Sequence, residues 1–216
     1  QFSISENNFL GKGVKLSTGL RISETRLRGN FTVVNPNFNY SDKALSTDIF
    51  LTDTDKLNDS GYKSTNAGFS LGTGFEQYDD FFFRPTFRTT YEELTTNSSA
   101  SKNLKKQEGS YFTTNIGYVF DLDKRNQRFQ TTDGFQSIFT QNVPLISESY
   151  TLLNGYQIDT YHSFNDVTTS LGLYLRAVTG LSDDVRISER LNLPRNRLRG
   201  FESGKIGPVD ANDHVG

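Results

Sequence analysis

The 216-residue sequence contains no cysteine, no methionine and no tryptophan. The absence of cysteine excludes a disulfide framework and thiolate metal sites. No stretch approaches the roughly 18–20 consecutive apolar residues that a transmembrane helix needs. Charge of one sign is not in excess either, since the formal net charge is -2. This balance gives no electrostatic reason to expect nucleic-acid binding.

Aromatic residues are abundant instead, with 18 Phe and 10 Tyr, which is far too many for a disordered chain. Only 34% of the residues are apolar and the mean hydropathy is -0.56, values that look too polar for a membrane protein. A transmembrane β-barrel nevertheless shows apolar side chains to lipid only at every second position, while the other half faces a wet lumen. The composition is therefore compatible with a membrane barrel.

Strict alternation of side-chain character is the dominant pattern of the chain. Across residues 110–123, mostly apolar residues from Phe112 to Leu122 alternate with residues such as Asn115 and Asp121. Side chains two positions apart lie on the same face of a strand, so this pattern predicts a strand with two different faces. The same pattern predicts about nine complete strands and the remnant of another along the chain. Besides residues 110–123, the predicted strands are residues 2–6, 14–23, 27–33, 45–54, 68–76, 83–92, 135–143, 152–161 and 171–176.

Charged residues collect on the polar faces of these segments, at Lys15, Arg21, Arg28, Asp48, Glu76, Arg84, Arg88, Glu92 and Arg176. In a soluble β-sandwich they would face solvent, whereas in a barrel they would line an aqueous interior. Most segments reach the roughly 9–11 residues that cross a bilayer at a tilt, while soluble strands average about 5–6. Strand length therefore favours an all-β fold, an incomplete antiparallel transmembrane β-barrel with meander topology.

The connections between the predicted strands differ in length. Residues 7–11, 35–43 and 77–80 are compact, whereas residues 95–109 form a longer polar loop. Short turns on one side and long loops on the other are typical of outer-membrane barrels. We expect one partial barrel domain over residues 1–216, an internal fragment of a larger protein, with strands and turns over 1–181 and a long loop over 182–216.

Short motifs carry a resemblance to a known family. The long loop contains Leu193-Pro194, then Leu198-Arg199-Gly200-Phe201, then Ile206-Gly207-Pro208. Earlier motifs occur in the family's order, at residues 2–13, 34–38 and 133–135. Together they are similar to the BamA family of outer-membrane assembly factors, within the bacterial surface-antigen superfamily. The resemblance spans nearly all of the chain and implies about ten of roughly sixteen strands, followed by the sixth extracellular loop.

The resemblance implies a multi-pass protein of the bacterial outer membrane that folds and inserts other β-barrels, with no enzymatic chemistry and no cofactor. It implies unfolded barrel clients, assembly lipoproteins, periplasmic chaperones and outer-membrane lipid as partners, and POTRA domains that lie outside this chain. A related TamA-type protein, a two-partner secretion pore and a passive outer-membrane channel are the alternatives. A soluble β-sandwich binding module is a further one.

In the family the sixth loop folds back into the lumen, and its arginine pairs with carboxylates on the inner wall. Arg199 matches that arginine, and its planar guanidinium suits bidentate pairing with a carboxylate. Gly200 would allow a tight backbone path and Phe201 a wedge against the wall, although Arg199 could equally serve only to pin the loop. The expected lumen-inserted motif is Leu198, Arg199, Gly200, Phe201, Ile206, Gly207 and Pro208, and the expected lumen-facing charges are Arg84, Arg88, Glu92 and Arg176.

Catalytic chemistry finds little support in the sequence. The two histidines, His162 and His214, have no second ligand at metal-binding spacing. Ser163 adjoins His162, which raises the idea of a catalytic Ser–His pair. Adjacent residues of a strand point to opposite faces, however, so the two side chains would not meet. We therefore expect no catalytic residues and no metal site.

Overall fold

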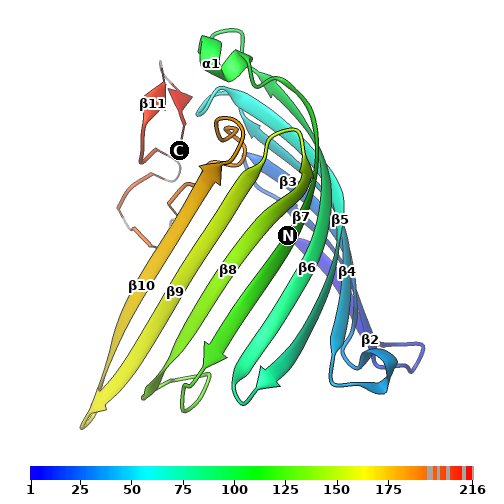
Figure 1. Ribbon diagram of the computed structural model, residues 1–216, viewed down its shortest axis with the longest axis vertical. Coiled ribbons are helices and arrows are strands. Elements are labelled where there is room, and N and C mark those ends of the chain that lie inside the picture. Colours follow the sequence, from blue (N-terminus) through cyan, green and yellow to red (C-terminus); the bar gives the residue numbers. More distant parts are fainter. Residues whose placement is uncertain (194–196, 199, 203–204, 211–212, 216) are drawn as a thin grey trace.

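The computed structural model describes residues 1–193, 197–198, 200–202, 205–210 and 213–215 (Figure 1). Ten long strands form one antiparallel sheet in which each strand pairs with its neighbours in the chain, in the order β1 to β10. They are β1 (Phe2–Phe9), β2 (Val14–Ile22), β3 (Arg26–Asn35), β4 (Ala44–Lys56), β5 (Tyr62–Tyr78), β6 (Phe81–Thr96), β7 (Gly109–Asp123), β8 (Gly134–Ser147), β9 (Thr151–Phe164) and β10 (Val167–Gly180).

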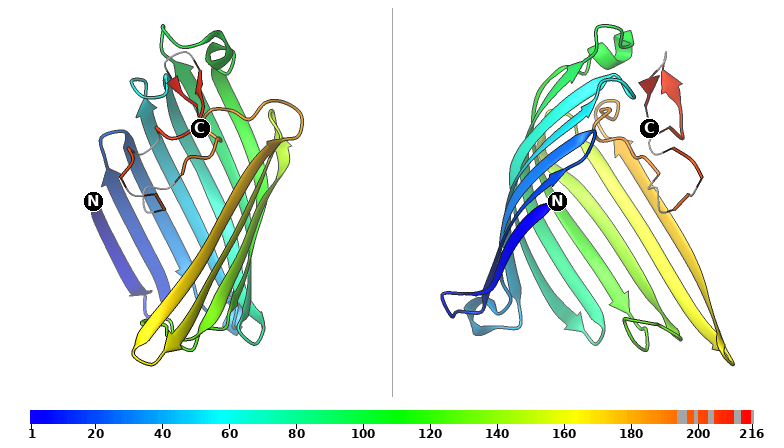
Figure 2. Two further views of the ribbon diagram at one scale, coloured as in Figure 1. Left: turned by 90° about the vertical axis from the view of Figure 1, so that its left-hand side faces the viewer. Right: turned by 180° about the vertical axis from the view of Figure 1, so that it is seen from behind.

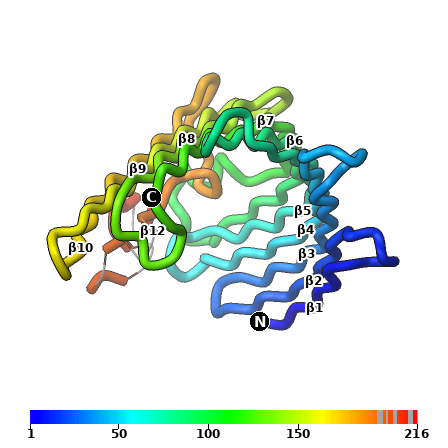
Figure 3. Tube along the Cα trace, turned by 90° about the horizontal axis from the view of Figure 1, so that it is seen from below, coloured from blue at the N-terminus to red at the C-terminus, as the bar shows by residue number. Residues whose placement is uncertain are grey.

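The sheet curls into part of a cylinder wall, with the segment after β10 on its concave side (Figures 2 and 3). Strands β1 and β10 are its two edges, and within the described residues they do not pair with each other. This arrangement confirms the predicted fold class, an all-β, incomplete antiparallel barrel with meander topology. The β-sandwich alternative is wrong, because in the described part of the chain no second long sheet covers the first.

Several strands run further than the sequence pattern predicted. Strand β5 begins at Tyr62 instead of residue 68, and β6 continues to Thr96 instead of ending at Glu92. Near these ends polar residues such as Thr65 and Asn66 occupy both faces, so the alternation that marks a strand in the sequence disappears. The backbone ladder continues regardless, because its hydrogen bonds do not depend on side-chain character.

The outer face of the sheet is apolar and uncovered. The side chains that it exposes include Ile49, Leu51, Phe69, Leu71, Phe87, Phe112, Ile116, Leu171, Leu173 and Leu175, with 38–76% of each residue's surface accessible. Where β6 begins and β7 ends, aromatic rings on this face stack across strands, with the Phe83 and Phe120 centroids 4.9 Å apart. An apolar band edged by aromatic rings is typical of a barrel wall that contacts lipid.

The connections contain short elements that the sequence pattern did not predict. Helix α1 (Lys102–Lys105) forms a single turn between β6 and β7, and the Ser101 hydroxyl caps it by accepting from the Leu104 N–H. Strands β11 (Val209–Asp210) and β12 (Asp213–His214) form a small hairpin in the loop after β10. No helix within the described residues is long and apolar enough to cross a membrane.

A charge on the outer face should destabilise the barrel, whereas the same charge on the inner face should not. Ile116 lies on the outer face of β7, and Thr140 lies on the inner face of β8. We predict that Ile116→Arg costs about 2–4 kcal/mol, as for a cation on the lipid face near the bilayer midplane, and that Thr140→Arg costs much less. Urea unfolding of the full-length protein in lipid vesicles measures both, and equal costs would contradict this assignment of faces.

Candidate functional site

The loop after β10 is anchored by an apolar cluster at the upper rim of the sheet. Ile187 and Val215 of the loop are buried with residues of β5, β6 and the β6–β7 connection, namely Tyr62, Leu94, Ala100 and Leu104. Leu94 has only 1% of its surface exposed. Each buried side chain of this size contributes about 1.5–3 kcal/mol, so the cluster holds two distant points of the loop against the wall.

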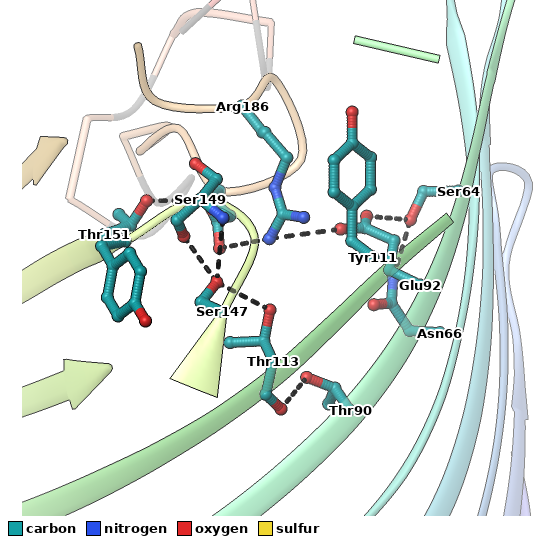
Figure 4. A network of polar contacts seen from close by, with 12 residues as sticks. Ser64, Asn66, Thr90, Glu92, Tyr111, Thr113, Ser147, Ser149, Thr151 and Arg186 are labelled. Carbon is teal, nitrogen blue, oxygen red and sulfur yellow. Dashed lines mark hydrogen bonds and ion pairs between the residues drawn. The ribbon is translucent and has the colours of Figure 1, made fainter. Parts of the chain in front are cut away.

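Arg186 directly precedes Ile187 and is buried with only 4% of its surface exposed (Figure 4). Its guanidinium lies over the Tyr111 ring of β7, 4.1 Å from the centroid. Its Nη2 atom lies 2.7 Å from Oε1 of Glu189 in the same loop and 3.8 Å from Oε2 of Glu92 on β6. A loop arginine is therefore placed between a carboxylate of the loop and a carboxylate of the inner wall.

The two carboxylates are themselves held in place. The Ser64 hydroxyl donates to Oε1 of Glu92 at 2.7 Å, and the Asn66 side chain donates to the Ser64 hydroxyl at the same distance. The Thr151 hydroxyl donates to Oε2 of Glu189 at 2.9 Å. Because isolated buried charges cost several kcal/mol each, this hydrogen-bonded arrangement favours one docked position of the loop over others.

Further polar contacts tether the loop to the rim. The Ile187 backbone N–H donates to the side-chain oxygen of Gln107 at 2.8 Å. The Ser101 hydroxyl donates to a carboxylate oxygen of Asp210 at 2.7 Å, beside the β11–β12 hairpin. The loop and the β6–β7 connection, the two longest connections in the chain, therefore support one another above the sheet.

A second arginine of the loop reaches the inner wall on the opposite side. Arg197 donates to the side-chain oxygen of Gln157 on β9 at 3.0 Å and lies over the Tyr174 ring of β10, 4.6 Å from the centroid. Gln157 and Tyr174 face each other across the β9–β10 ladder. The loop thus contacts both the β5–β7 and the β9–β10 parts of the concave face.

The four charged residues predicted to face the lumen share the concave face with these contacts. Glu92 meets the loop arginine, Arg84 forms an ion pair with Asp121 of β7, and Arg88 lies over the Phe50 ring at 3.9 Å. Arg176 pairs across strands with Gly155, on the same face of β10 as Tyr174. Of these predicted residues, only Glu92 contacts the loop by an ion pair in the described part of the chain.

The predicted loop motif is only partly described. Arg199, its central residue, and Pro194 lie outside the described residues. Leu198 and Ile206 are half-buried, Gly207 and Pro208 are exposed, and Phe201 has 59% of its surface exposed. Gly200 has a φ of 87°, in the left-handed region that favours glycine. The lumen-inserted role of Arg199 therefore stays a prediction.

Sequence reasoning missed the arginine that is seen to dock. Arg186, Ile187 and Glu189 precede the motif, in a stretch of the loop without a recognisable pattern. A local signal existed, because an arginine three residues before a glutamate at the start of the loop can pair with it. The partner Glu92 is distant in the chain, and only the curled sheet brings it close.

A curled antiparallel wall with an apolar outer face and a loop held on its concave side defines a transmembrane-type β-barrel wall. The chain belongs to the Omp85 superfamily, since the model of the Omp85 superfamily domain matches residues 8–216. None of the curated proteins matches the chain.

Among solved structures, the chain is similar to BamA from Haemophilus ducreyi in a crystal structure that lacks POTRA domains 1–3. The TM-score is 0.86 at 19% sequence identity, and the match covers 95% of this chain and 43% of that one. The chain thus spans less than half the length of the protein it matches. At this identity the likeness shows the fold, and it confirms the resemblance to a BamA-type barrel that the motifs predicted.

Removal of the Arg186 side chain should release the loop. We predict that Arg186→Ala destabilises docking by about 3–5 kcal/mol, because two carboxylates then lose their buried cation. Limited proteolysis of the full-length protein in detergent should show much faster cleavage within residues 181–215.

Lys205→Ala is the matched control, since it removes a loop cation from an exposed ion pair with Glu202. Such pairs contribute about 0–1 kcal/mol, so cleavage should remain close to wild type. Equal protection of the wild-type and Arg186→Ala loops would show that Arg186 does not anchor the loop.

Proposed function

We propose that the protein to which this chain belongs inserts and folds β-barrel proteins in the bacterial outer membrane. The observation that carries the proposal is the combination of Omp85 membership with a BamA-like wall whose long loop is docked on the concave face. The work is conformational, with no covalent step.

The docked loop favours assembly over passive diffusion. A diffusion channel works best with an open lumen, whereas here the loop spans the concave face between Glu92 on β6 and Gln157 on β9. Its anchor is a buried network and an apolar cluster, so holding it in place stabilises the wall. A secretion pore of the same superfamily is the second candidate, because the loop motif is shared with those relatives.

The ladder restricts where a client could add its strands. Strands β2 to β9 are paired on both sides, so their backbone donors and acceptors are already used. An incoming strand needs an unpaired edge with free N–H and C=O groups. We therefore place client pairing at a seam formed by strands other than β2–β9.

The proposal includes partners that lie outside this chain. They are POTRA domains before the barrel, unfolded barrel clients, assembly lipoproteins, periplasmic chaperones and the lipid of the outer membrane. We also propose that the motif around Arg199, which follows Arg186 in the same loop, inserts into the lumen.

Depletion of the full-length protein tests this proposal. We predict that the outer-membrane levels of several unrelated β-barrel proteins fall together, because all depend on one assembly step. Quantitative immunoblots of outer-membrane fractions measure this, and re-expression of the wild-type protein is the control. Unchanged barrel levels, with loss of one secreted substrate or of small-solute uptake, would instead identify a pore.

A further inference from the structure

The inner face of β2–β6 carries an excess of positive charge. Arg21 of β2 and Arg28 of β3 stand directly opposite each other in the ladder, an arrangement that is destabilising for like charges. Arg26 of β3 and Arg88 of β6 share this face with them. Within the described residues none of the four forms an ion pair with a carboxylate, although other inner-face charges such as Arg84 do.

A cavity of about 220 Å³ lies between Arg26 and Arg88 on this wall. Its lining offers hydroxyl, amide and guanidinium groups and contains no carboxylate, the residues being Arg26, Phe50, Thr52, Thr54, Tyr62, Ser64, Asn66, Arg88 and Ser188. The larger cavities at the two ends of the sheet are each lined by three or more acidic residues. The chemistry of this cavity therefore suits an acceptor with negative charge.

Arg88 is fixed in position before any ligand arrives. Its guanidinium stacks on the Phe50 ring at 3.9 Å. The Phe50 ring in turn lies over Gly68, its cross-strand partner, where an added Cβ would come within 2.8 Å of the ring and 2.3 Å of the Thr89 carbonyl oxygen. The glycine thus makes room for the aromatic ring that orients the arginine, and a preoriented cation loses little entropy on binding.

The docked loop contributes to the same cavity. Ser188 lies two residues after the Arg186 anchor and lines the cavity, and its buried hydroxyl has no hydrogen-bond partner among the described residues. Two carboxylates of the same wall, Glu92 and Asp48, do not line the cavity. Glu92 is held by Ser64 and Arg186, and Asp48 accepts a hydrogen bond from the Thr32 hydroxyl. The loop arginine therefore neutralises Glu92, and no carboxylate lines the cavity beside Arg26 and Arg88.

We infer that the inner wall of β3–β6 binds a phosphate-type oxyanion between Arg26 and Arg88, beneath Ser188 of the docked loop. The two guanidinium groups supply charge-assisted hydrogen bonds, which are the stronger kind, and the hydroxyls complete the shell. The cavity has room for a free tetrahedral oxyanion with a few waters. Because Ser188 belongs to the loop, a bound oxyanion stabilises the loop in its docked position.

Inorganic phosphate is the probe for this site. The full-length protein in phosphate-free detergent micelles is titrated with sodium phosphate, against sodium chloride at matched ionic strength, while thermal unfolding and loop proteolysis are followed. We predict a saturable rise of the unfolding temperature and slower loop cleavage with phosphate only. Arg26→Gln and Arg88→Gln should each weaken the apparent affinity about tenfold or more, as expected for a lost hydrogen bond to a charged group.

Lys15→Gln is the matched control, because it removes a cation from β2 on the same face but outside the cavity, and it should bind phosphate like wild type. Ser188→Ala provides a variant that leaves the wall intact and should weaken binding more modestly. The inference is overturned if chloride stabilises as well as phosphate, if Lys15→Gln weakens binding as much as Arg88→Gln, or if only added lipopolysaccharide stabilises. No client is present in this assay, so its failure leaves the assembly role untouched.

Discussion

The backbone of a membrane-spanning sheet must satisfy its own hydrogen bonds, and this constraint shapes the rest of the molecule. In lipid each unpaired N–H or C=O costs several kcal/mol, so the chain forms one continuous antiparallel ladder from β1 to β10. Alternation along that ladder sends apolar side chains outward and polar ones inward. The sheet therefore has no apolar core between layers. The one cluster of buried apolar residues in the described part forms where the loop, with Ile187 and Val215, meets the rim.

The loop consequently has two physical roles at once. It supplies the apolar contacts that the wall lacks on its concave side, and its arginine compensates the charge of a wall carboxylate there. Arg186 pairs with Glu92 and Glu189, while Arg26 and Arg88 line a nearby cavity that contains no carboxylate. Docking of the loop and binding of an oxyanion are thus linked through Ser188, which adjoins both. A loop held in this way responds to changes in the wall that it contacts.

Alternation within single strands made most of the fold predictable, because it is a local property with a period of two. The ends of β5 and β6 were not predictable in this way, since residues such as Thr65 and Asn66 are polar on both faces. Glu92 was recognised as an inward-facing charge, but its partner Arg186 was not, because that contact joins residues far apart in the chain. The motif around Arg199 was recognisable from its residue types alone, whereas the position of the loop depends on packing that no local pattern records.

The central claim, that the loop is docked on the concave face, can be tested most directly by cross-linking, because the chain has no native cysteine. Ile187→Cys combined with Leu94→Cys places two thiols in the same buried cluster, and the account predicts rapid cross-linking by a short bifunctional thiol reagent in native membranes. Ile187→Cys combined with Phe87→Cys should not react, because Phe87 lies on the outer face of β6, the strand that carries Leu94. Equal cross-linking of both pairs, or of neither, would contradict the docked loop.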